Sequence, residues 1–177
     1  AFLGWHECRV KPFKQQRRIF RDTEKELTRA EYIRLLKTAR NRGNIRLFYI
    51  MQTLCTTGIR ISELRFITAE AVKTGEAVVN CKGKTRTVLL VKKLRRELAA
   101  YCRQRNIVSG PVFVTRTGEP VNRSNIWGEM KGLCRGAGVD CRKVFPHNFR
   151  HLFAVSFYNL EKDIGKLADL LGHASIE

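Results

Sequence analysis

Four side chains that are chemically suited to bind a phosphate lie in three short motifs that are far apart in the sequence. They are Arg60, His147, Arg150 and His173. A phosphodiester under attack spreads negative charge over its non-bridging oxygens, and a planar guanidinium matches those oxygens with paired donors. Arg60 and Arg150 are therefore the first candidates for a clamp on a reacting phosphate.

The motifs that contain these residues are specific as a set. They read Thr-Gly-Ile-Arg-Ile-Ser-Glu-Leu at residues 57–64, His-x-x-Arg at 147–150 and Leu-Gly-His at 171–173. In this order they resemble the catalytic domain of the tyrosine recombinases, the family to which phage and transposon integrases belong. The resemblance runs from about Leu27 to Glu177. It implies site-specific cutting and rejoining of double-stranded DNA, with no metal, ATP or other cofactor.

The resemblance also implies a role for each residue. Arg60 and Arg150 would hold the non-bridging oxygens, His147 would assist proton transfer, and His173 would bond the phosphate. Glu63, three residues after Arg60, is expected to hold a guanidinium in place without taking part in the chemistry.

A β-hairpin is expected where two β-rich runs, 77–81 and 85–90, flank a short turn that contains Gly83. In the family a lysine on this hairpin protonates the leaving 5′ oxygen. Lys82 fits that position best, and Lys84 remains open as a substitute. Read without the surrounding motifs, both would be edge-strand lysines that discourage aggregation.

The nucleophile of the family is a tyrosine that lies beyond the Leu-Gly-His motif and forms a 3′-phosphotyrosyl link. The sequence ends at Glu177, four residues beyond His173. The tyrosines present occupy helix positions that suit packing: Tyr32, Tyr49, Tyr101 and Tyr158. We therefore expect a catalytic domain that is incomplete at its C-terminal side and binds DNA without cleaving it. A covalent adduct on a nicked suicide substrate would contradict this expectation.

The charge of the chain favours a polyanionic partner. Among its 177 residues, Lys and Arg number 34 and Asp and Glu 16, which gives a formal net charge of +18. Nucleic acid is the leading partner, and affinity for it should fall steeply with salt. A membrane surface is the competing polyanion, but the basic residues are dispersed and no apolar run approaches a membrane-spanning length. No small-molecule substrate is expected, and the resemblance implies a homo-oligomer, a tetramer on DNA.

The cysteines indicate a reducing, cytoplasmic compartment, and the resemblance implies that the protein is associated with the nucleoid. There are six in a chain large enough to need no disulfide framework. Cys55 and Cys102 fall in segments that predict buried helix, where a thiol behaves as a small hydrophobe. No metal site is expected, because the remaining candidates lack the close paired spacing of zinc ligands: His6, Cys8, Cys134 and Cys141.

The periodicity predicts an α+β fold, mainly α-helical with a small antiparallel β-sheet. A basic arm at 1–25, where the family joins a separate DNA-binding domain, precedes one catalytic domain at 26–177. Helices are expected from 28 to about 41, at 45–57, 61–67 and 91–106, after 124, at 146–159 and at 164–171, with a short β element at 112–120.

Helix caps and buried faces are predicted as well. Thr28, Ser124, Pro146 and Asp163 are taken as helix starts and Gly58 and Gly172 as helix ends. The side chains expected to face inward are Ile33, Leu36 and Ala39 in the first helix, Leu94, Leu98 and Tyr101 in the basic helix, Ile126, Trp127, Met130 and Leu133 in the next, and Phe153, Ala154 and Phe157 near the end. His147 and Arg150 would project from the margin of that last face towards Arg60, and His151 would pack or hydrogen-bond.

Three other functions remain open. A type IB topoisomerase would use the same groups to relax supercoils, but it would not exchange two marked DNA substrates. A non-catalytic DNA-binding module would lose affinity modestly on substitution of Arg60 or Arg150 and would show no special role for His147. An RNA-binding protein is less favoured, because no aromatic pair at strand spacing offers a stacking platform.

Overall fold

The computed structural model describes residues 25–81, 84–115 and 117–172. The expected arm at 1–25 therefore lies, except for its last residue, outside the described residues, and so do Lys82 and His173. The α-helices are α1 Arg29–Asn41, α2 Ile45–Thr57, α3 Ala69–Thr74, α4 Lys92–Gln104, α5 Arg123–Ala137, α6 Pro146–Glu161 and α7 Ile164–Leu171; the strands are β1 Glu76–Cys81 and β2 Lys84–Leu89; two short 3-10 helices are η2 Ile61–Phe66 and η3 Cys141–Lys143. This is the predicted fold class.

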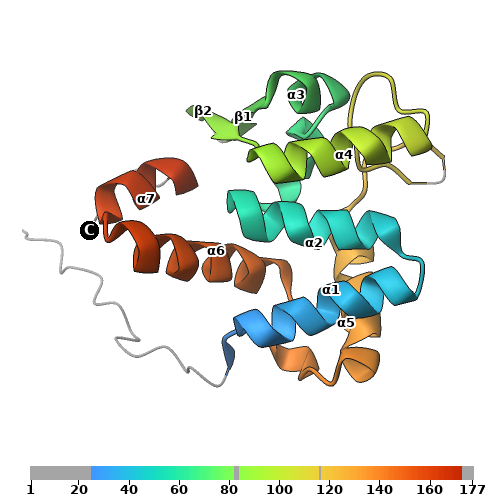
Figure 1. The fold of residues 1–177 in the computed structure, drawn as a ribbon, viewed down its shortest axis with the longest axis vertical. Coiled ribbons are helices and arrows are strands. Elements are labelled where there is room, and N and C mark those ends of the chain that lie inside the picture. The colour runs from blue at the N-terminus through green and yellow to red at the C-terminus, as the bar shows by residue number, and fades with distance from the viewer. Residues whose placement is uncertain (1–24, 82–83, 116, 173–177) are drawn as a thin grey trace, which may run out of the picture.

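Helix α2 lies at the centre of the fold and contacts α1, α4, α5 and α6. In Figure 1 it runs between α4 and α1, and its C-terminal end points to the side where the hairpin and α7 lie. Its apolar side chains occupy most of its circumference, as the sequence indicates, and those that are fully buried include Leu47, Ile50, Met51 and Leu54. Burial on all sides makes α2 a rigid support for whatever follows its C-terminus.

Helix α1 begins as predicted. The Thr28 hydroxyl accepts a hydrogen bond from the Glu31 amide, and the Glu31 carboxylate accepts one from the Thr28 amide, which forms a capping box. The inward face was predicted only in part, because Leu35 and Ala39 are buried and Ile33 is exposed. A single apolar residue at the edge of a helical stripe does not decide which side of the stripe meets the core.

Helix α5 differs from the prediction in its cap and in its exposed face. Its N-cap is Asn122, whose side chain accepts from the Asn125 amide, so the prediction of Ser124 was wrong by two residues. Trp127 is 49% exposed, whereas Ile126 and Met130 are buried as expected. The indole therefore lies outside the core.

The two strands of the predicted hairpin are present, and the predicted turn residues Lys82 and Gly83 lie outside the described residues. Strands β1 and β2 are antiparallel, with Val79 opposite Arg86 and Cys81 opposite Lys84. Burial alternates along β2, where Val88 is buried and Leu89 is exposed. The predicted β element at 112–120 consists only of isolated bridges in the described residues there, and the short helix α3 was not predicted.

Helices α6 and α7 start as expected, with Pro146 in the first turn of α6 and Asp163 as the N-cap of α7. Helix α7 ends at its C-cap Gly172 as expected, whereas α6 runs to Glu161, two residues beyond its predicted end. The buried residues of α6 are Asn148, Phe149, Arg150 and Leu152. The predicted face of Phe153, Ala154 and Phe157 is only half-buried, which corrects the prediction.

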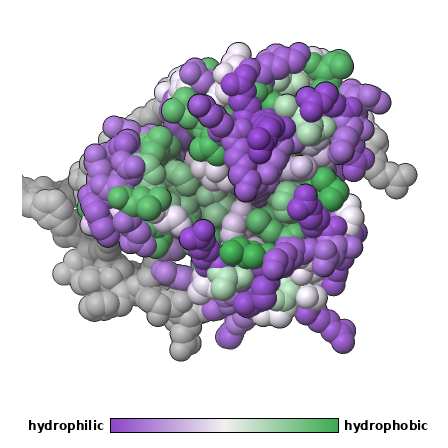
Figure 2. All heavy atoms as spheres, in the orientation of Figure 1, coloured by the Kyte–Doolittle hydropathy of each residue, from purple (hydrophilic) through white to green (hydrophobic). Residues whose placement is uncertain are grey.

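Apolar side chains stay exposed on these two helices, among them Leu160 and Ile164. Figure 2 shows apolar side chains gathered in this region of the surface, with hydrophilic ones around them. No helix within the described ranges has the length and apolar character needed to cross a membrane.

Candidate phosphate-binding site

The first side of the site is the corner that follows α2. Gly58 ends the helix with a φ of 64°, and Arg60 then caps η2 in an extended conformation. The carboxylate of Glu63 receives the Arg60 backbone amide on Oε2 at 2.7 Å and the Arg60 Nη1 on Oε1 at 3.0 Å. Glu63 is 1% exposed. The expected orienting ion pair is therefore present, and it fixes both the backbone and the guanidinium of Arg60.

The second side is Arg150, which reaches this corner from α6. Its Nη1 donates to the Gly58 carbonyl at 2.5 Å, and its Nη2 donates to the Leu171 carbonyl at 2.7 Å. Arg150 is 6% exposed, so its predicted position at the margin of the helix was wrong, whereas its predicted direction towards Arg60 agrees with the cavity that both residues line. The carbonyls at the C-terminal ends of α2 and α7 hold it in the interior, where these partial negative charges suit a cation.

The electrostatics of Arg150 reflect this position. Its pKa is lowered to about 10, first by burial and then by the positive charges of Arg60 and Arg86, while Glu63 acts in the opposite direction. A cation held near other cations and away from water gains when an anion approaches. The arrangement can therefore attract a phosphate.

A cavity of about 380 Å³ opens where these elements meet. It is lined by Arg60, His147 and Arg150, together with Ile59, Ile61, Ser62, Arg123, Trp127, Phe145 and Pro146. The structure thus brings the three described members of the predicted catalytic set to one pocket, from two motifs separated by more than eighty residues. His147 is exposed and is the most exposed of these three residues.

The two remaining members lie outside the described residues. Lys82 would follow Cys81, where β1 ends, and Lys84 begins β2. His173 would follow Gly172, the cap of α7. These roles, like those of Arg60, His147 and Arg150, stay predictions.

Sequence reasoning missed three residues at this site. Arg123 and Trp127 line the cavity, and Arg86 binds Glu63 through its Nη2 at 2.6 Å. Arg86 shares the alternation of β2 with the buried Val88, so the strand period placed an arginine on the inward face. An inward arginine requires an acceptor. That signal was available in the sequence.

The tyrosines were predicted to pack, and three of them do. Tyr32 meets Phe149 edge-on with ring centroids 6.1 Å apart, and Tyr49 lies 5.2 Å from Tyr101. Burial raises the pKa of all three hydroxyls. Tyr158 is 39% exposed, so the packing prediction was wrong there; the Lys162 ammonium lies 5.4 Å from its ring centroid.

His151 makes the predicted hydrogen-bond contact, and Cys102 is buried as predicted. The His151 Nε2 lies 3.0 Å from Glu26 Oε1, within hydrogen-bond distance. Cys102 is buried, Cys55 is half-buried, and burial raises the pKa of both thiols. The four cysteines whose side chains are described are free: Cys55, Cys102, Cys134 and Cys141. No cluster of three or more potential metal ligands occurs within the described ranges.

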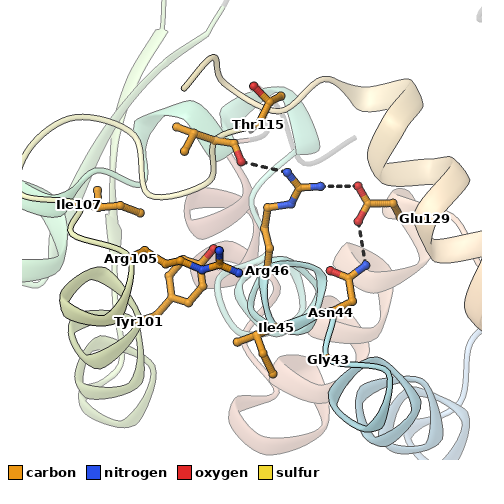
Figure 3. A pocket seen from close by; sticks show the side chains of 10 residues that line it. Gly43, Asn44, Ile45, Arg46, Tyr101, Arg105, Ile107, Thr115 and Glu129 are labelled. Carbon is orange, nitrogen blue, oxygen red and sulfur yellow. Dashed lines mark hydrogen bonds and ion pairs between the residues drawn. The ribbon is translucent and has the colours of Figure 1, made fainter. Parts of the chain in front are cut away.

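A larger cavity, of about 520 Å³, lies at the opposite end of α2. Figure 3 shows its polar groups bonded to one another: Arg46 donates to Glu129 and to the Val114 carbonyl, and Asn44 donates to the second Glu129 oxygen. These groups satisfy each other across α2 and α5. The larger cavity is therefore a packing junction, and the three described members of the predicted catalytic set line the smaller one.

Comparison with known proteins agrees with the geometry. The model of the phage integrase family matches residues 25–177. The chain is 31% identical over 159 residues to the tyrosine recombinase XerA of Pyrococcus furiosus, which covers 86% of this chain and 54% of that protein.

Two solved structures are similar to the fold. A crystal structure of XerA recombinase superposes with a TM-score of 0.73 at 28% identity, over 85% of this chain and 55% of that one. A pre-cleavage complex of the XerH site-specific recombinase with its difH substrate gives a TM-score of 0.71 over 85% of this chain and 48% of that one; its 21% identity shows the fold alone. The chain spans about half the length of these relatives. Because the family model matches residues 25–177, which include all of the described residues, the chain belongs to the phage integrase family of tyrosine recombinases.

Proposed function

We propose that this chain provides the phosphate-gripping site of a site-specific DNA recombinase. One observation carries the proposal: Arg60, His147 and Arg150, which come from two distant motifs, line a single cavity. The partner is double-stranded DNA, supported by the net charge of +18. Residues 26–177 serve as the catalytic domain, residues 1–25 as its basic arm, and the active form is a homo-oligomer, a tetramer on DNA.

The proposed reaction proceeds through a 3′-phosphotyrosyl intermediate. The hydroxyl of the family's tyrosine attacks the scissile phosphate, forms a P–O bond and releases the 5′ oxygen, which takes a proton from a lysine. Attack by a 5′ hydroxyl from a partner strand reverses the step, so the bond energy is kept. Arg60 and Arg150 stabilise the charge that develops on the non-bridging oxygens, and His147 assists proton transfer.

The remaining roles fall on residues next to described elements. Lys82 or Lys84 donates the proton to the leaving group from the hairpin, and His173 bonds the phosphate from the end of α7. We further propose that the protein works on nucleoid DNA in the cytoplasm, which the free thiols of the described cysteines support.

DNA binding is tested first, on the 177-residue chain. Fluorescence anisotropy with a 30-bp duplex over a range of salt should give a log–log slope of several units, because several phosphates are neutralised. Arg60→Ala and His147→Ala should change the affinity by less than about tenfold. A shallow salt slope, or equal preference for single-stranded RNA, would argue against a duplex-DNA site.

The chemistry is tested in the protein made from the complete reading frame. The substrate is a set of duplexes enriched from a random library by binding to the protein. Nicked suicide versions of these duplexes trap the covalent protein–DNA adduct that cleavage forms. Arg60→Lys should lower the cleavage rate by about 10²- to 10³-fold at saturating protein. A methylphosphonate at the scissile position, which lacks one negative charge, should recover part of that loss.

A matched control separates chemistry from folding. Arg95 donates to backbone carbonyls of Val72 and Lys73 in α3, away from the cavity, so Arg95→Lys should leave cleavage unchanged. Absence of cleavage by the protein with its natural sequence would favour the non-catalytic DNA-binding module, and unaltered cleavage in the Arg60 and His147 variants would refute the roles proposed for these two residues. Relaxation of supercoils without exchange between two marked substrates would favour the topoisomerase.

A further inference from the structure

Arg86 is an arginine on the inward side of the hairpin, and its side chain is only 14% exposed. Its Nη2 donates to Glu63 Oε2 at 2.6 Å, and its Nη1 donates to the Leu170 carbonyl at 3.0 Å. A guanidinium in the interior costs stability unless such acceptors are present. Both terminal nitrogens of Arg86 are therefore committed to protein partners.

The end of α7 packs directly on this side chain. A Cβ built on Gly172 would lie 2.7 Å from both Cδ and Nε of Arg86, closer than real Cβ contacts occur, and the φ of Gly172 is 65°. Only glycine allows this backbone conformation at this approach without displacing Arg86. The hairpin and the C-terminal end of α7 are thus joined through one side chain.

The two acceptors of Arg86 also belong to the supports of the two phosphate-gripping arginines. Glu63 is the carboxylate that holds Arg60, and its Oε2 accepts from both the Arg60 amide and Arg86. The Leu170 carbonyl is adjacent in the chain to the Leu171 carbonyl, which holds Arg150. A shift of Arg86 therefore moves the support of Arg60 and the support of Arg150 together.

We propose that Arg86 is a positioning residue that sets the distance between Arg60 and Arg150. This inference rests on the proposed function, because it concerns the same phosphate. Arg86 acts through Glu63 and the end of α7, whereas Arg60 and Arg150 themselves line the cavity. Its positive charge also lies close enough to lower the pKa of Arg150.

The substitution Arg86→Lys provides the test, because it keeps the charge and loses the planar fork that spans two acceptors. The first measurement needs no catalysis. Arginine Nε–Hε NMR signals of the 177-residue chain should shift for both Arg60 and Arg150 in Arg86→Lys. Arg95→Lys, which alters another arginine that bridges two elements, should leave both signals in place.

A second variant covers the case in which Arg86→Lys does not fold. Gly172→Ala presses on Arg86 from the other side and should shift the same two signals. Backbone amide spectra establish that each variant is folded. If either the Arg60 or the Arg150 signal stays in place in a folded variant, Arg86 does not position both residues and the inference is wrong.

The second measurement is a double-mutant cycle on single-turnover cleavage, in the protein from the complete reading frame. Arg86→Lys alone should lower the rate by about 100-fold with DNA affinity unchanged, as expected when reacting groups are misplaced by about 1 Å. In an Arg60→Lys background the same change should lower the rate by less than about threefold, because the group it positions is already altered. A purely structural residue would give additive losses, which would overturn the inference.

The two proposals fail in different ways. A wild-type protein that cleaves no duplex refutes the proposed function and leaves the NMR result on Arg86 intact. An active wild-type protein with additive losses in the cycle refutes the role of Arg86 and leaves the proposed function intact.

Discussion

Replacement of Gly58 by alanine should destabilise the protein far more than an ordinary glycine substitution. Gly58 ends α2 with a φ of 64°, and a Cβ there would lie 2.4 Å from Cδ1 and 2.7 Å from Cε1 of Phe153. The same Cβ would lie 3.0 Å from Leu171 Cδ2. Helices α6 and α7 therefore both approach this position, and neither leaves room for a methyl group.

The expected cost has two parts. A left-handed conformation costs a non-glycine residue about 1 kcal/mol, and forcing a methyl group into a packed interior adds about 1–3 kcal/mol. Gly43→Ala isolates the first part, because Gly43 has a φ of 68° and nothing lies within 4 Å of its Cβ position. Urea unfolding followed by circular dichroism should give a loss of about 1 kcal/mol for Gly43→Ala and about 2–4 kcal/mol for Gly58→Ala, with equal m-values.

The comparison has a clear refuting result. If the two variants lose the same free energy of unfolding to within about 0.5 kcal/mol, Phe153 yields without cost and α6 is not tightly held against the end of α2. A tightly held α6 also predicts a loss of cleavage in Gly58→Ala, because the Gly58 carbonyl accepts the hydrogen bond from Arg150.

Three further predictions test the site and its surroundings. Glu63→Gln removes the buried carboxylate shared by two guanidiniums and should cost about 3 kcal/mol in urea unfolding; a loss below about 1 kcal/mol would mean that the ion pairs are not coupled to folding. In Trp5→Phe, the remaining indole, Trp127 on the cavity wall, should change its fluorescence on addition of duplex DNA, and an unchanged signal at saturating DNA would place the duplex elsewhere. Iodoacetamide at pH 8 should modify the exposed Cys141 before Cys55. Burial raises the pKa of Cys55 to about 11, so that about one Cys55 thiol in a thousand is ionised at pH 8. Peptide mass mapping gives the order of modification, and unfolding in urea should abolish the difference between the two thiols.

Local chemistry made much of this fold predictable from the sequence. The capping box of Thr28 and Glu31, the proline that opens α6 and the glycines that end α2 and α7 act within a few residues of themselves. Strong local signals of this kind fix where elements begin and end. The buried α2 was also predicted with its bounds, because its apolar residues surround the helix and leave no choice of face.

The faces of amphipathic helices were less predictable. Trp127 and Phe157 have the apolar character of core residues, yet Trp127 lines the cavity and Phe157 is half-buried. Which side of a helix meets the core depends on how its neighbours are oriented, and this information is spread over the whole chain. An aromatic side chain beside a binding cavity looks, in sequence, like any other buried aromatic.

The site shows the same contrast between local motifs, which the sequence reveals, and packing, which depends on the whole chain. The motifs identified Arg60, His147 and Arg150, and the structure brings these three to one cavity. They did not indicate that Arg150 would be buried by the carbonyls of Gly58 and Leu171, because backbone acceptors carry no residue signature. Arg86 differs, because strand alternation alone places it on the inward face, where a guanidinium requires an acceptor.

The charge balance of the cluster predicts which anion it prefers. Arg60, Arg86 and Arg150 interact with one another and with Glu63, so three positive charges against one negative charge leave an excess of two. A phosphodiester carries one negative charge and a pentavalent transition state two, so the excess is matched more fully as the proposed reaction proceeds.

A divalent anion should therefore stabilise the chain. With sulfate at ten times its dissociation constant the gain is about 1.4 kcal/mol relative to chloride at equal ionic strength, measured by urea unfolding. Sulfate also strengthens apolar burial in general, so Arg60→Gln should lose the increment and Arg95→Gln should keep it. An equal increment in both variants would show that the anion acts outside this cluster.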